Sequence, residues 1–549
     1  MLQVENLQVA YPSSQLGEQI NWAVNDVSFT LDAGERLGLV GESGCGKSTL
    51  GRAVMRLLPP FSQIEGQISF QGESVLEFNS ARLRQFRGEA VGLVFQDPMT
   101  RLDPLMTIGA HCVETLLAHS PSLSRQEAKT KALETLEAVR IPAERWGQYP
   151  HEFSGGMRQR VAIALALMLD PKLIVADEPT TSLDVTVSAE ILGELTRLCR
   201  EREMALLLIS HDLAMVAEYC DRISVMYNGE MVESGPVKSI FENPQHDYTR
   251  SLLESALHIQ AVDSKEEAAQ QKVKAKIQPL LRVRELKKYY VLEGNFLQQF
   301  FSKETKVIKA VDNINFDLYA GEILGLVGES GCGKSTLSRT ILQLIRPTSG
   351  SIEFLGQEIT GLSPAALRPI RQGMQMIFQD PHACLNPLMT VGQSIADPLY
   401  IHGLARGNEA KERVKEMLAR VGLTPVEEYY RRYPGDLSGG QQQRVAIARA
   451  LITHPQLVIC DEPVSMLDAS VQTQVLELML ALKAEFNLTY LFITHDLSVA
   501  RFFCDRIAVM NRGKIVELGN THDIFTTAQH PYTQKLLNAA PLLTVPSPK

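Results

Sequence analysis

The chain has 549 residues, well beyond the roughly 250–300 residues at which a single hydrophobic core stops growing, so at least two domains are expected. Apolar residues make up 45% and charged residues 21% of the sequence, which is typical of globular domains and excludes a membrane-embedded composition. The formal net charge of -9 provides no general electrostatic attraction to nucleic acid, although it leaves room for a local basic patch.

The sequence begins without a basic segment followed by an apolar block, so no signal peptide is predicted and the chain is expected to stay in the cytoplasm. The longest apolar run, at residues 161–169, is about half as long as a membrane-spanning helix needs to be. The eight cysteines are scattered and form no C-x-x-C pair. This spacing predicts neither a zinc site, nor an iron–sulfur cluster, nor a disulfide framework.

One sequence pattern occurs twice along the chain. The segment LGLVGESGCGKSTL at residues 37–50 recurs letter for letter at residues 324–337, and FQDP, SGG, DEP and HDL follow in the same order in both halves. Two domains are therefore predicted at residues 1–256 and 279–549, joined by a Lys-, Glu-, Gln- and Ala-rich linker at residues 257–278. The second copy has an extra segment before its repeated loop, and its apolar cluster is expected to pack locally; the cluster consists of Phe296, Leu297, Phe300 and Phe301.

Short β-branched runs alternate with helical stretches in each copy, which predicts an α/β fold with a mostly parallel sheet covered by helices. In the first copy these runs are RLGLV, AVGLVF, KLIVAD and ALLLIS. The repeated motifs stand at the ends of the runs. Because ligands bind at the carboxyl ends of strands in open α/β sheets, we expect the motifs to form one site in each copy.

Both copies of GESGCGKS fit the phosphate-binding pattern GxxxxGK[ST], directly after an apolar strand and ahead of a helical stretch. Backbone N–H groups of such a P-loop face phosphate oxygens, the lysine neutralises the β and γ phosphates, and the final hydroxyl binds magnesium. The predicted loop residues are Gly41, Ser43, Gly44, Cys45, Gly46, Lys47, Ser48 and Thr49, and Gly328, Ser330, Gly331, Cys332, Gly333, Lys334, Ser335 and Thr336.

Two carboxylates close each of the apolar strands LIVAD and LVICD. Asp177 and Asp461 are placed to hold magnesium through its water shell. Glu178 and Glu462, one residue further on, are placed to orient and polarise the water that attacks the γ phosphate. After a P-loop, this arrangement predicts nucleotide hydrolysis.

Polar side chains also close two other strands of each copy. His211 and His495 follow LLLIS and LFIT, positions from which an imidazole could reach a γ phosphate, although each histidine taken alone is better explained by a core or helix-capping role. Gln96 and Gln379 follow another strand and are placed to touch both magnesium and the attacking water. Alone, the glutamines are weak indicators.

The segments FSGGMRQRVAIA at residue 153 and LSGGQQQRVAIA at residue 437 resemble the signature of the ATP-binding cassette (ABC) ATPases. The resemblance covers nearly the whole chain and implies two P-loop NTPase domains, each with a helical subdomain that carries the signature. In this family the signature of one domain faces the P-loop of the other, so each domain is expected to complete the other's site. The signature residues implied to bind nucleotide are Ser154, Gly155 and Gly156, and Ser438, Gly439, Gly440 and Gln441.

Tyr11 and Tyr290 occupy the position at which family members stack an aromatic ring on adenine. The alternative is an ordinary tyrosine that packs on its strand, and Tyr289 leaves the register of the second copy open. One departure from the family pattern is Met157, which replaces the signature glutamine in the first copy. It predicts a slower second site, although the resemblance also implies that methionine is usual here in the first of two paired subunits.

The stretches FQDPMTRLDPLMTIG and FQDPHACLNPLMTVG, and the later segments HDYTRSLLESA and HPYTQKLLNAA, resemble ATPases of importers for dipeptides, oligopeptides and nickel. This resemblance implies a subunit that binds and hydrolyses ATP with Mg²⁺ and powers uptake of peptides or related small solutes. It also implies two transmembrane permease subunits and an extracytoplasmic solute-binding protein as partners, no nucleic acid, and a place at the cytoplasmic face of the bacterial inner membrane.

Three other ABC classes fit the sequence less well than the importer. Tandem translation factors usually carry a long charged helical linker, and here the linker is short. ATPases of DNA repair carry zinc motifs or coiled-coil insertions, which this sequence lacks. Exporters often fuse membrane spans to the ATPase. The importer therefore remains the leading hypothesis.

Overall fold

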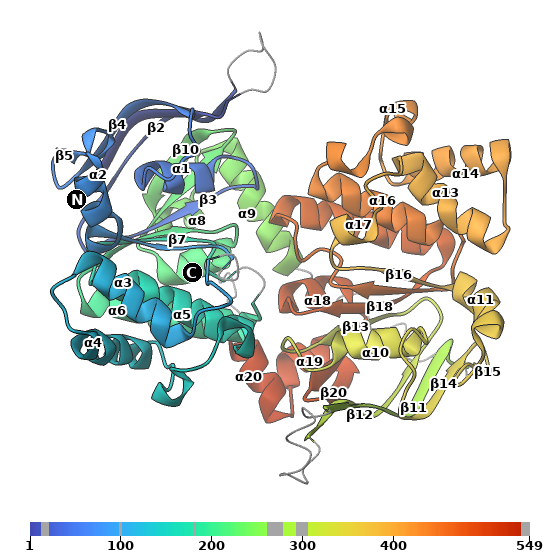
Figure 1. Ribbon diagram of the computed structural model, residues 1–549. Coiled ribbons are helices and arrows are strands. Elements are labelled where there is room, and N and C mark those ends of the chain that lie inside the picture. The colour runs from blue at the N-terminus through green and yellow to red at the C-terminus, as the bar shows by residue number, and fades with distance from the viewer. Residues whose placement is uncertain (13–20, 98–100, 181–182, 261–277, 293–305, 540–549) are drawn as a thin grey trace. The chain divides into compact units, whose positions relative to one another are not determined.

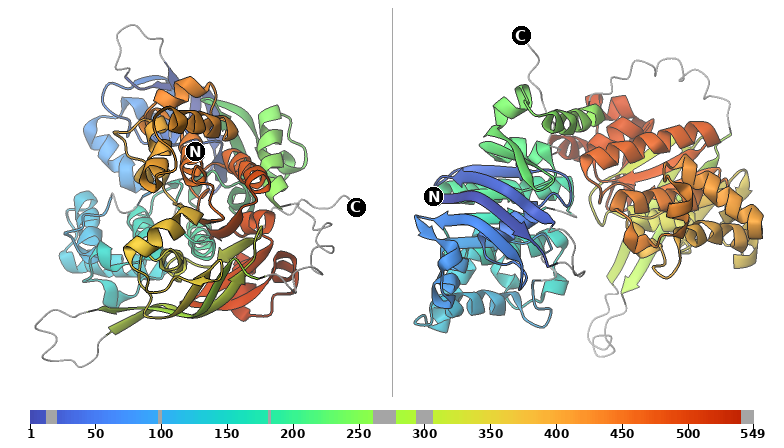
Figure 2. Two further views of the ribbon diagram at one scale, coloured as in Figure 1. Left: turned by 90° about the vertical axis from the view of Figure 1, so that its right-hand side faces the viewer. Right: turned by 90° about the horizontal axis from the view of Figure 1, so that it is seen from above.

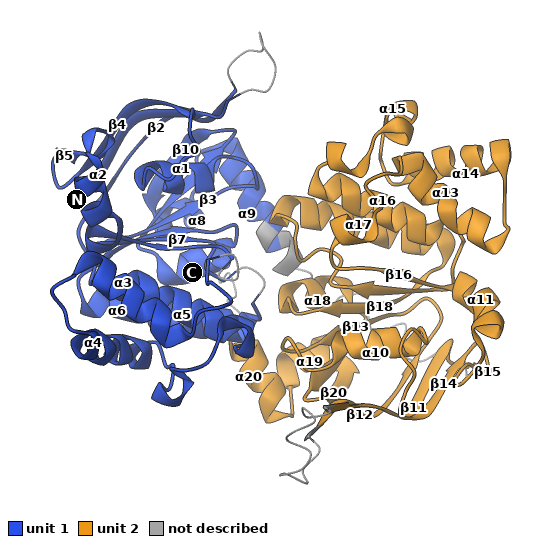
Figure 3. Cartoon of the chain, in the orientation of Figure 1, with its two compact units in different colours: residues 1–257, 541–549 blue, residues 258–540 orange. Residues whose placement is uncertain are grey.

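The computed structural model describes the chain except residues 13–20, 98–100, 181–182, 261–277, 293–305 and 540–549 (Figure 1). The described residues fall into two compact units, Met1–Leu257 and His258–Ala540 (Figure 3). Most of the predicted linker lies outside the described residues, as does the apolar cluster of the second copy. Among the helices that are described, none is both long and apolar enough to cross a membrane.

A six-stranded sheet with the order β10-β9-β3-β8-β7-β6 forms the centre of the first unit. Five of its strands are parallel, and β10 is antiparallel to β9 at one edge. The strands are β3 (Arg36–Val40), β6 (Val91–Val94), β7 (Leu173–Asp177), β8 (Ala205–Ile209), β9 (Arg222–Tyr227) and β10 (Glu230–Pro236). The fully apolar β8 is buried on both faces: Leu206 and Leu208 enter one core cluster, and Leu207 and Ile209 enter the other.

A separate antiparallel sheet with the order β2-β1-β4-β5 packs on the same unit, and the sequence analysis did not predict it. It consists of β1 (Leu2–Ala10), β2 (Trp22–Leu31), β4 (Gln63–Phe70) and β5 (Glu73–Ser74). The blue strands of the first unit make this layer visible in Figure 2. Its buried residues, such as Leu2 and Ile68, share a core cluster with the six-stranded sheet.

Helices surround the large sheet, and α3, α4 and α5 contact one another as a helical subdomain. The helices of the first unit are α1 (Lys47–Val54), α2 (Ser80–Gln85), α3 (Ile108–His119), α4 (Arg125–Ala138), α5 (Gly155–Leu167), α6 (Val185–Glu201), α7 (Leu213–Tyr219), α8 (Val237–Glu242) and α9 (Asp247–Gln260). The signature begins α5. The predicted fold class, an α/β domain with a signature-bearing helical subdomain, is confirmed.

The second unit repeats this design with the sheet orders β12-β11-β14-β15 and β16-β17-β18-β13-β19-β20. Its strands are β11 (Leu281–Leu292), β12 (Lys306–Leu318), β13 (Ile323–Val327), β14 (Ser349–Phe354), β15 (Gln357–Glu358), β16 (Met374–Ile377), β17 (Leu457–Asp461), β18 (Thr489–Thr494), β19 (Arg506–Asn511) and β20 (Lys514–Asn520). Its helices are α10 (Lys334–Ile341), α11 (Pro364–Gly373), α12 (Pro381–Cys384), α13 (Val391–His402), α14 (Gly407–Arg420), α15 (Val426–Arg431), α16 (Gly439–Leu451), α17 (Ala469–Phe486), α18 (Leu497–Phe503), α19 (Thr521–Thr527) and α20 (Pro531–Ala539).

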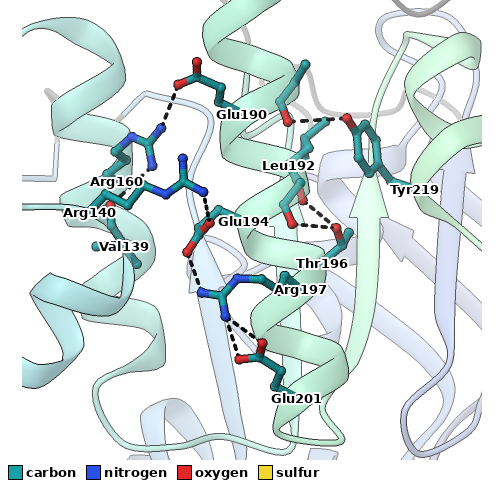
Figure 4. A network of polar contacts seen from close by, with 12 residues as sticks. Val139, Arg140, Arg160, Glu190, Leu192, Glu194, Thr196, Arg197, Glu201 and Tyr219 are labelled. Atoms are coloured by element: carbon teal, nitrogen blue, oxygen red, sulfur yellow. Dashed lines mark hydrogen bonds and ion pairs between the residues drawn. The ribbon is translucent and has the colours of Figure 1, made fainter. Parts of the chain in front are cut away.

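Ion pairs tie the helical subdomain of the first unit to α6 (Figure 4). Arg160 of α5 lies 3.2 Å from the carboxylate of Glu190 on α6. The side chain of Glu194, only 6% exposed, lies 3.1 Å from Arg140 and 2.6 Å from Arg197. A buried carboxylate requires such partners because its charge is otherwise poorly solvated.

Among its described residues, the second unit does not repeat this network. Leu478 of α17 stands at the position that Glu194 occupies on α6, and it packs against the apolar core. The two units therefore hold equivalent helices by different interactions.

Candidate functional site

The P-loop lysine of each unit is buried and is held by the carbonyl groups of its own loop. Lys47 is 5% exposed, and its Nζ donates hydrogen bonds to the carbonyl oxygens of Gly41 and Glu42 at 2.7 and 2.8 Å. Lys334 makes the equivalent bonds at 2.6 and 3.1 Å. These carbonyls compensate the charge of a buried ammonium group, which would otherwise be costly to desolvate.

One glycine is required at the point where each P-loop enters its helix. Gly46 has φ 103°, and a Cβ on it would lie 2.1 Å from the carbonyl oxygen of Ala23. Gly333 has φ 111°, and a Cβ there would lie 2.0 Å from the carbonyl oxygen of Ala310. Only glycine adopts this backbone without strain and without a clash, so the loop can lie this close to the neighbouring strand.

The final hydroxyl of each P-loop meets the first carboxylate of the adjacent strand end. Ser48 Oγ donates to Asp177 Oδ1 at 2.8 Å, and Ser335 Oγ donates to Asp461 Oδ1 at 3.2 Å. Burial raises the pKa of both aspartates, and the adjacent glutamate adds to this, while the serine hydrogen bond opposes it. The structure thus brings together the hydroxyl and carboxylate that the sequence predicted as partners.

The second carboxylate of each pair follows a change in backbone direction. Glu178 and Glu462 have φ values of 47° and 50°, in the left-handed region. Their N–H groups donate to the carbonyl oxygens of Ile209 and Ile493, both at 2.9 Å. Non-glycine residues in this region are strained, and such strain is concentrated at functional sites. The hydrogen bond to the neighbouring strand holds each glutamate in this conformation.

Glutamine and histidine side chains converge on the carboxylate of Glu178 in the first unit. Gln96 Nε2 donates to Glu178 Oε2 at 2.9 Å, and Nδ1 of His211 lies 3.4 Å from Glu178 Oε1. These residues follow β6, β7 and β8, which are neighbours in the sheet. The strand order therefore explains why residues far apart in the sequence meet.

The second unit has the same arrangement with a closer histidine. Gln379 Nε2 donates to Glu462 Oε2 at 2.9 Å, and His495 Nδ1 lies 3.0 Å from the same oxygen. Burial, the largest single effect, would raise the pKa of Glu462, but the hydrogen bond and the charge of His495, together with the charge of Lys334, outweigh it and the pKa is lowered. Burial alone would lower the pKa of His495, but Glu462 outweighs it and the pKa is raised. Both directions describe an ion pair.

The signature serines cap the N-termini of their helices, but only the second cap is complete. Ser154 Oγ accepts the N–H of Met157 at 3.4 Å. Ser438 Oγ accepts the N–H of Gln441 at 3.4 Å, and Gln441 Oε1 accepts the N–H of Ser438 at 3.1 Å, which closes a capping box. Gln441 Nε2 also donates to the hydroxyl of Tyr429 at 3.0 Å. Met157 has no side-chain amide, so it cannot make the equivalents of these two Gln441 bonds in the first cap.

The tyrosines predicted to meet adenine are partly exposed in both units. The hydroxyl of Tyr11 lies 2.9 Å from Oγ1 of Thr49 in the helix that follows the P-loop. Tyr290 is 37% exposed with Lys288 over its ring, whereas the hydroxyl of Tyr289 donates to Asp312 at 2.6 Å. A lysine lies over each of these two rings, Lys309 over Tyr289 and Lys288 over Tyr290, so the role of Tyr290 in stacking stays a prediction.

Sequence reasoning missed one contact to each P-loop. The hydroxyl of Tyr248 accepts the N–H of Glu42 at 3.1 Å, and the hydroxyl of Tyr532 accepts the N–H of Glu329 at 3.2 Å. The available signal was the repeated segment HDYT and HPYT, which the sequence analysis used only as a family resemblance.

Each unit therefore places a phosphate loop, a buried ammonium, a serine–aspartate pair and a glutamate flanked by glutamine and histidine at one edge of a parallel sheet. This set of groups defines a nucleoside-triphosphate-hydrolysing P-loop protein. The comparisons narrow the class. Residues 24–181 and 311–465 match the ABC transporter family, and residues 232–280 and 516–548 match the oligopeptide/dipeptide transporter C-terminal region. The chain belongs to the ABC transporter family and is an ATPase.

The chain is similar to curated proteins over almost its whole length. It is 44% identical to the glutathione import ATP-binding protein GsiA of Escherichia coli (strain K12) and 43% identical to that of Pectobacterium atrosepticum. Both alignments cover 99% of this chain and 90% of the relative. A solved dimeric ATP-binding cassette bound to ADP and phosphate is 31% identical and covers 44% of this chain and 98% of its own, with a TM-score of 0.39.

Replacing both strand-end glutamates with glutamine tests the hydrolytic site. In Glu178→Gln with Glu462→Gln, the amide keeps the shape of the side chain but not its charge, so ATP turnover is expected to fall by about 10²-fold or more while ATP still binds. Phosphate release and ATP titration measure the two effects. Turnover that persists would remove both carboxylates from the chemistry.

The capping difference predicts a difference in stability. Gln441→Met removes the reciprocal cap bond and the bond to Tyr429, so we expect the melting midpoint of the second unit to fall by about 2–4 °C, equivalent to ~1 kcal/mol. Met157→Leu, which changes no hydrogen bond at the equivalent cap, is the matched control. Scanning calorimetry of the full chain gives both midpoints, and equal shifts would contradict the difference between the caps.

Proposed function

We propose that the chain powers the import of peptides or related small solutes. The observation that supports this most strongly is that each unit holds the complete set of hydrolytic groups and has, in its C-terminal part, a segment of the oligopeptide/dipeptide transporter type. Relatives at 43–44% identity are named for glutathione import, so a short peptide is the solute class we favour.

Mg²⁺ fits the paired serine and aspartate of each unit. Magnesium prefers oxygen ligands and is usually held by one or two protein groups together with substrate phosphates. Ser48 and Asp177, and likewise Ser335 and Asp461, supply such oxygens side by side. The bound ion would neutralise charge that develops on the phosphates.

The remaining polar groups position the attacking water in this proposal. The lowered pKa of Glu462 keeps it ionised, so it orients and polarises water more readily than it retains a proton. Gln379 donates to the same carboxylate and limits its rotation. Glu178 and Gln96 would act in the same way in the first unit, and the histidines would face the γ phosphate.

We also propose that each signature completes the site of the other unit. The support is the family resemblance, together with the chemistry of a serine hydroxyl and N–H groups at a helix N-terminus, which suit a γ phosphate. The first site would take Ser438 to Gln441, and the second would take Ser154 to Met157. The missing glutamine in the first signature then makes unequal turnover of the two sites an expectation.

Permease subunits are the proposed membrane partners, so the chain would lie at the cytoplasmic face of the bacterial inner membrane. Leu105 and Leu388, just after the FQDP motif of each unit, are 84% and 85% exposed. Single exposed leucines are common, but these two stand at equivalent positions shortly after Gln96 and Gln379, in segments called the glutamine loops from here on. They offer each unit an apolar contact for a helix of a permease subunit. An extracytoplasmic solute-binding protein would deliver the solute.

The importer assignment is tested by purifying the chain with its membrane neighbours. We expect its ATPase rate to rise when candidate peptides and the solute-binding protein are added together. Co-purification with ribosomes in the absence of membrane subunits would contradict the assignment and favour a translation factor.

The exposed leucines provide a separate test of the permease contact. Leu105→Glu and Leu388→Glu place a charge in the proposed apolar contact, so peptide-stimulated ATPase activity is expected to fall by about tenfold, as for the loss of one strong interface contact. Leu355→Glu, at another exposed leucine, is the control. A loss of stimulation in all three variants would show that the effect is not specific to the glutamine loops.

A further inference from the structure

One peptide group of the first P-loop is held from both sides. The carbonyl oxygen of Gly41 accepts a hydrogen bond from Lys47 Nζ at 2.7 Å, and the N–H of the same peptide, on Glu42, donates to the Tyr248 hydroxyl at 3.1 Å. The C=O and N–H of a trans peptide point in opposite directions. The lysine and the tyrosine therefore act on the same rigid plane, and a rotation of that plane would break both bonds.

The second unit shows the same arrangement independently. The carbonyl oxygen of Gly328 accepts from Lys334 Nζ at 2.6 Å, and the N–H of Glu329 donates to the Tyr532 hydroxyl at 3.2 Å. Burial raises the pKa of Tyr532, with Glu329 nearby, so the phenol stays neutral and keeps its hydroxyl.

This peptide needs an external restraint because it follows a glycine. Gly41 has φ 154° and Gly328 has φ 153°, and a Cβ on either would lie 2.2 Å from a backbone carbonyl oxygen of the adjoining strand. Glycine is required for this close approach, but it also leaves its own backbone dihedrals free to change. The tyrosine hydroxyl supplies a restraint that the glycine cannot.

A short network holds Tyr248 in place. The carboxylate of Glu233 on β10 accepts the N–H groups of Gln245 and His246 at 2.8 and 3.1 Å, and His246 Nδ1 accepts the N–H of Tyr248 at 3.2 Å. The ring of Tyr248 stacks on Tyr227 of β9, with centroids 4.2 Å apart. The start of α9 is thus fixed against the sheet that carries the P-loop.

The second unit fixes Tyr532 by the same backbone bonds but without the stacked ring. Glu517 accepts the N–H groups of Gln529 and His530 at 2.8 and 3.2 Å, and His530 Nδ1 accepts the N–H of Tyr532 at 3.1 Å. Asn511 ends β19 at the position where Tyr227 ends β9. The network of hydrogen bonds is the part that the two units share.

We infer that Tyr248 and Tyr532 are positioning residues of the two ATP sites, because their hydroxyls hold the Gly–Glu peptide whose carbonyl carries the P-loop lysine. The peptide-transporter C-terminal segment, which contains both tyrosines, then helps to position the P-loop of its own unit. This inference rests on ATP binding alone and stands whether or not the chain imports peptides.

The test uses the full chain with one P-loop silenced at a time. Tyr248→Phe is made in a Lys334→Ala background and Tyr532→Phe in a Lys47→Ala background, and the affinity for a fluorescent ATP analogue is titrated. Loss of a hydrogen bond to the loop backbone is expected to weaken binding by about 2–10-fold. With both lysines intact, the double Tyr→Phe variant is expected to raise KM for ATP more than it lowers kcat.

Hydrogen exchange supplies a readout that does not depend on activity. Without nucleotide, the amide of Glu42 is expected to exchange faster in Tyr248→Phe, and that of Glu329 faster in Tyr532→Phe, while the melting midpoint stays close to that of the parent. Tyr219→Phe and Tyr490→Phe are matched controls, because each also removes one hydroxyl that bonds the backbone, but outside the P-loops. The two hydroxyls donate to the carbonyl oxygens of Ala189 and Met479, at 3.3 and 3.2 Å.

Parent-like ATP affinity in both Tyr→Phe variants would overturn the inference, and so would an equal loss of affinity in the two controls. Failure of peptides to stimulate the ATPase would contradict the importer assignment and leave this result untouched. The two hypotheses therefore fail in different assays.

Discussion

A buried positive charge at the start of a helix constrains most of each unit. Lys47 and Lys334 are almost completely buried, and each begins its helix, where the helix dipole disfavours a cation. The loop carbonyls offset this cost, but they can do so only if the loop curls back over the lysine. That curl needs glycines at positive φ and close contact with the neighbouring strands. The negative charge of a phosphate group bound here would stabilise this buried ammonium group.

The order of the strands determines which groups share this site. In β3-β8-β7-β6 the P-loop strand lies beside the histidine strand, then the carboxylate strand, then the glutamine strand. Parallel strands end at the same edge, so side chains more than a hundred residues apart in the sequence become neighbours. The strained backbone of Glu178 turns its carboxylate between glutamine and histidine. The same logic in the second unit gives the tighter pair of Glu462 and His495.

The sequence predicted much of this arrangement, because motifs at strand ends carry their own spatial information once a parallel sheet is assumed. That reasoning placed Ser48 and Asp177 in one site, and the structure joins them by a hydrogen bond. The antiparallel sheet was not predicted, because its strands alternate buried and exposed residues irregularly and carry no motif. The tyrosine contacts were not predicted, since Tyr248 is some two hundred residues from Glu42. The contact also uses the backbone N–H of residue 42, which is present whatever the side chain there, so the sequence at that position does not indicate it.

Comparison of the two units separates the groups proposed to meet phosphate from the groups that support them. The P-loops have the same letters, and the Ser–Asp and Gln–Glu bonds recur within a few tenths of an ångström. The supporting groups differ between the units. Met157 of the first unit corresponds to Gln441 of the second, and Glu194 with its ion pairs corresponds to the apolar Leu478. Hydrolytic chemistry allows little change in the first set, whereas several kinds of packing can hold a helix. Any functional difference between the units is therefore expected to arise in the helical subdomains and their caps, where the two sequences have been free to diverge without disturbing the lysine, the carboxylates or the strand order on which both sites depend.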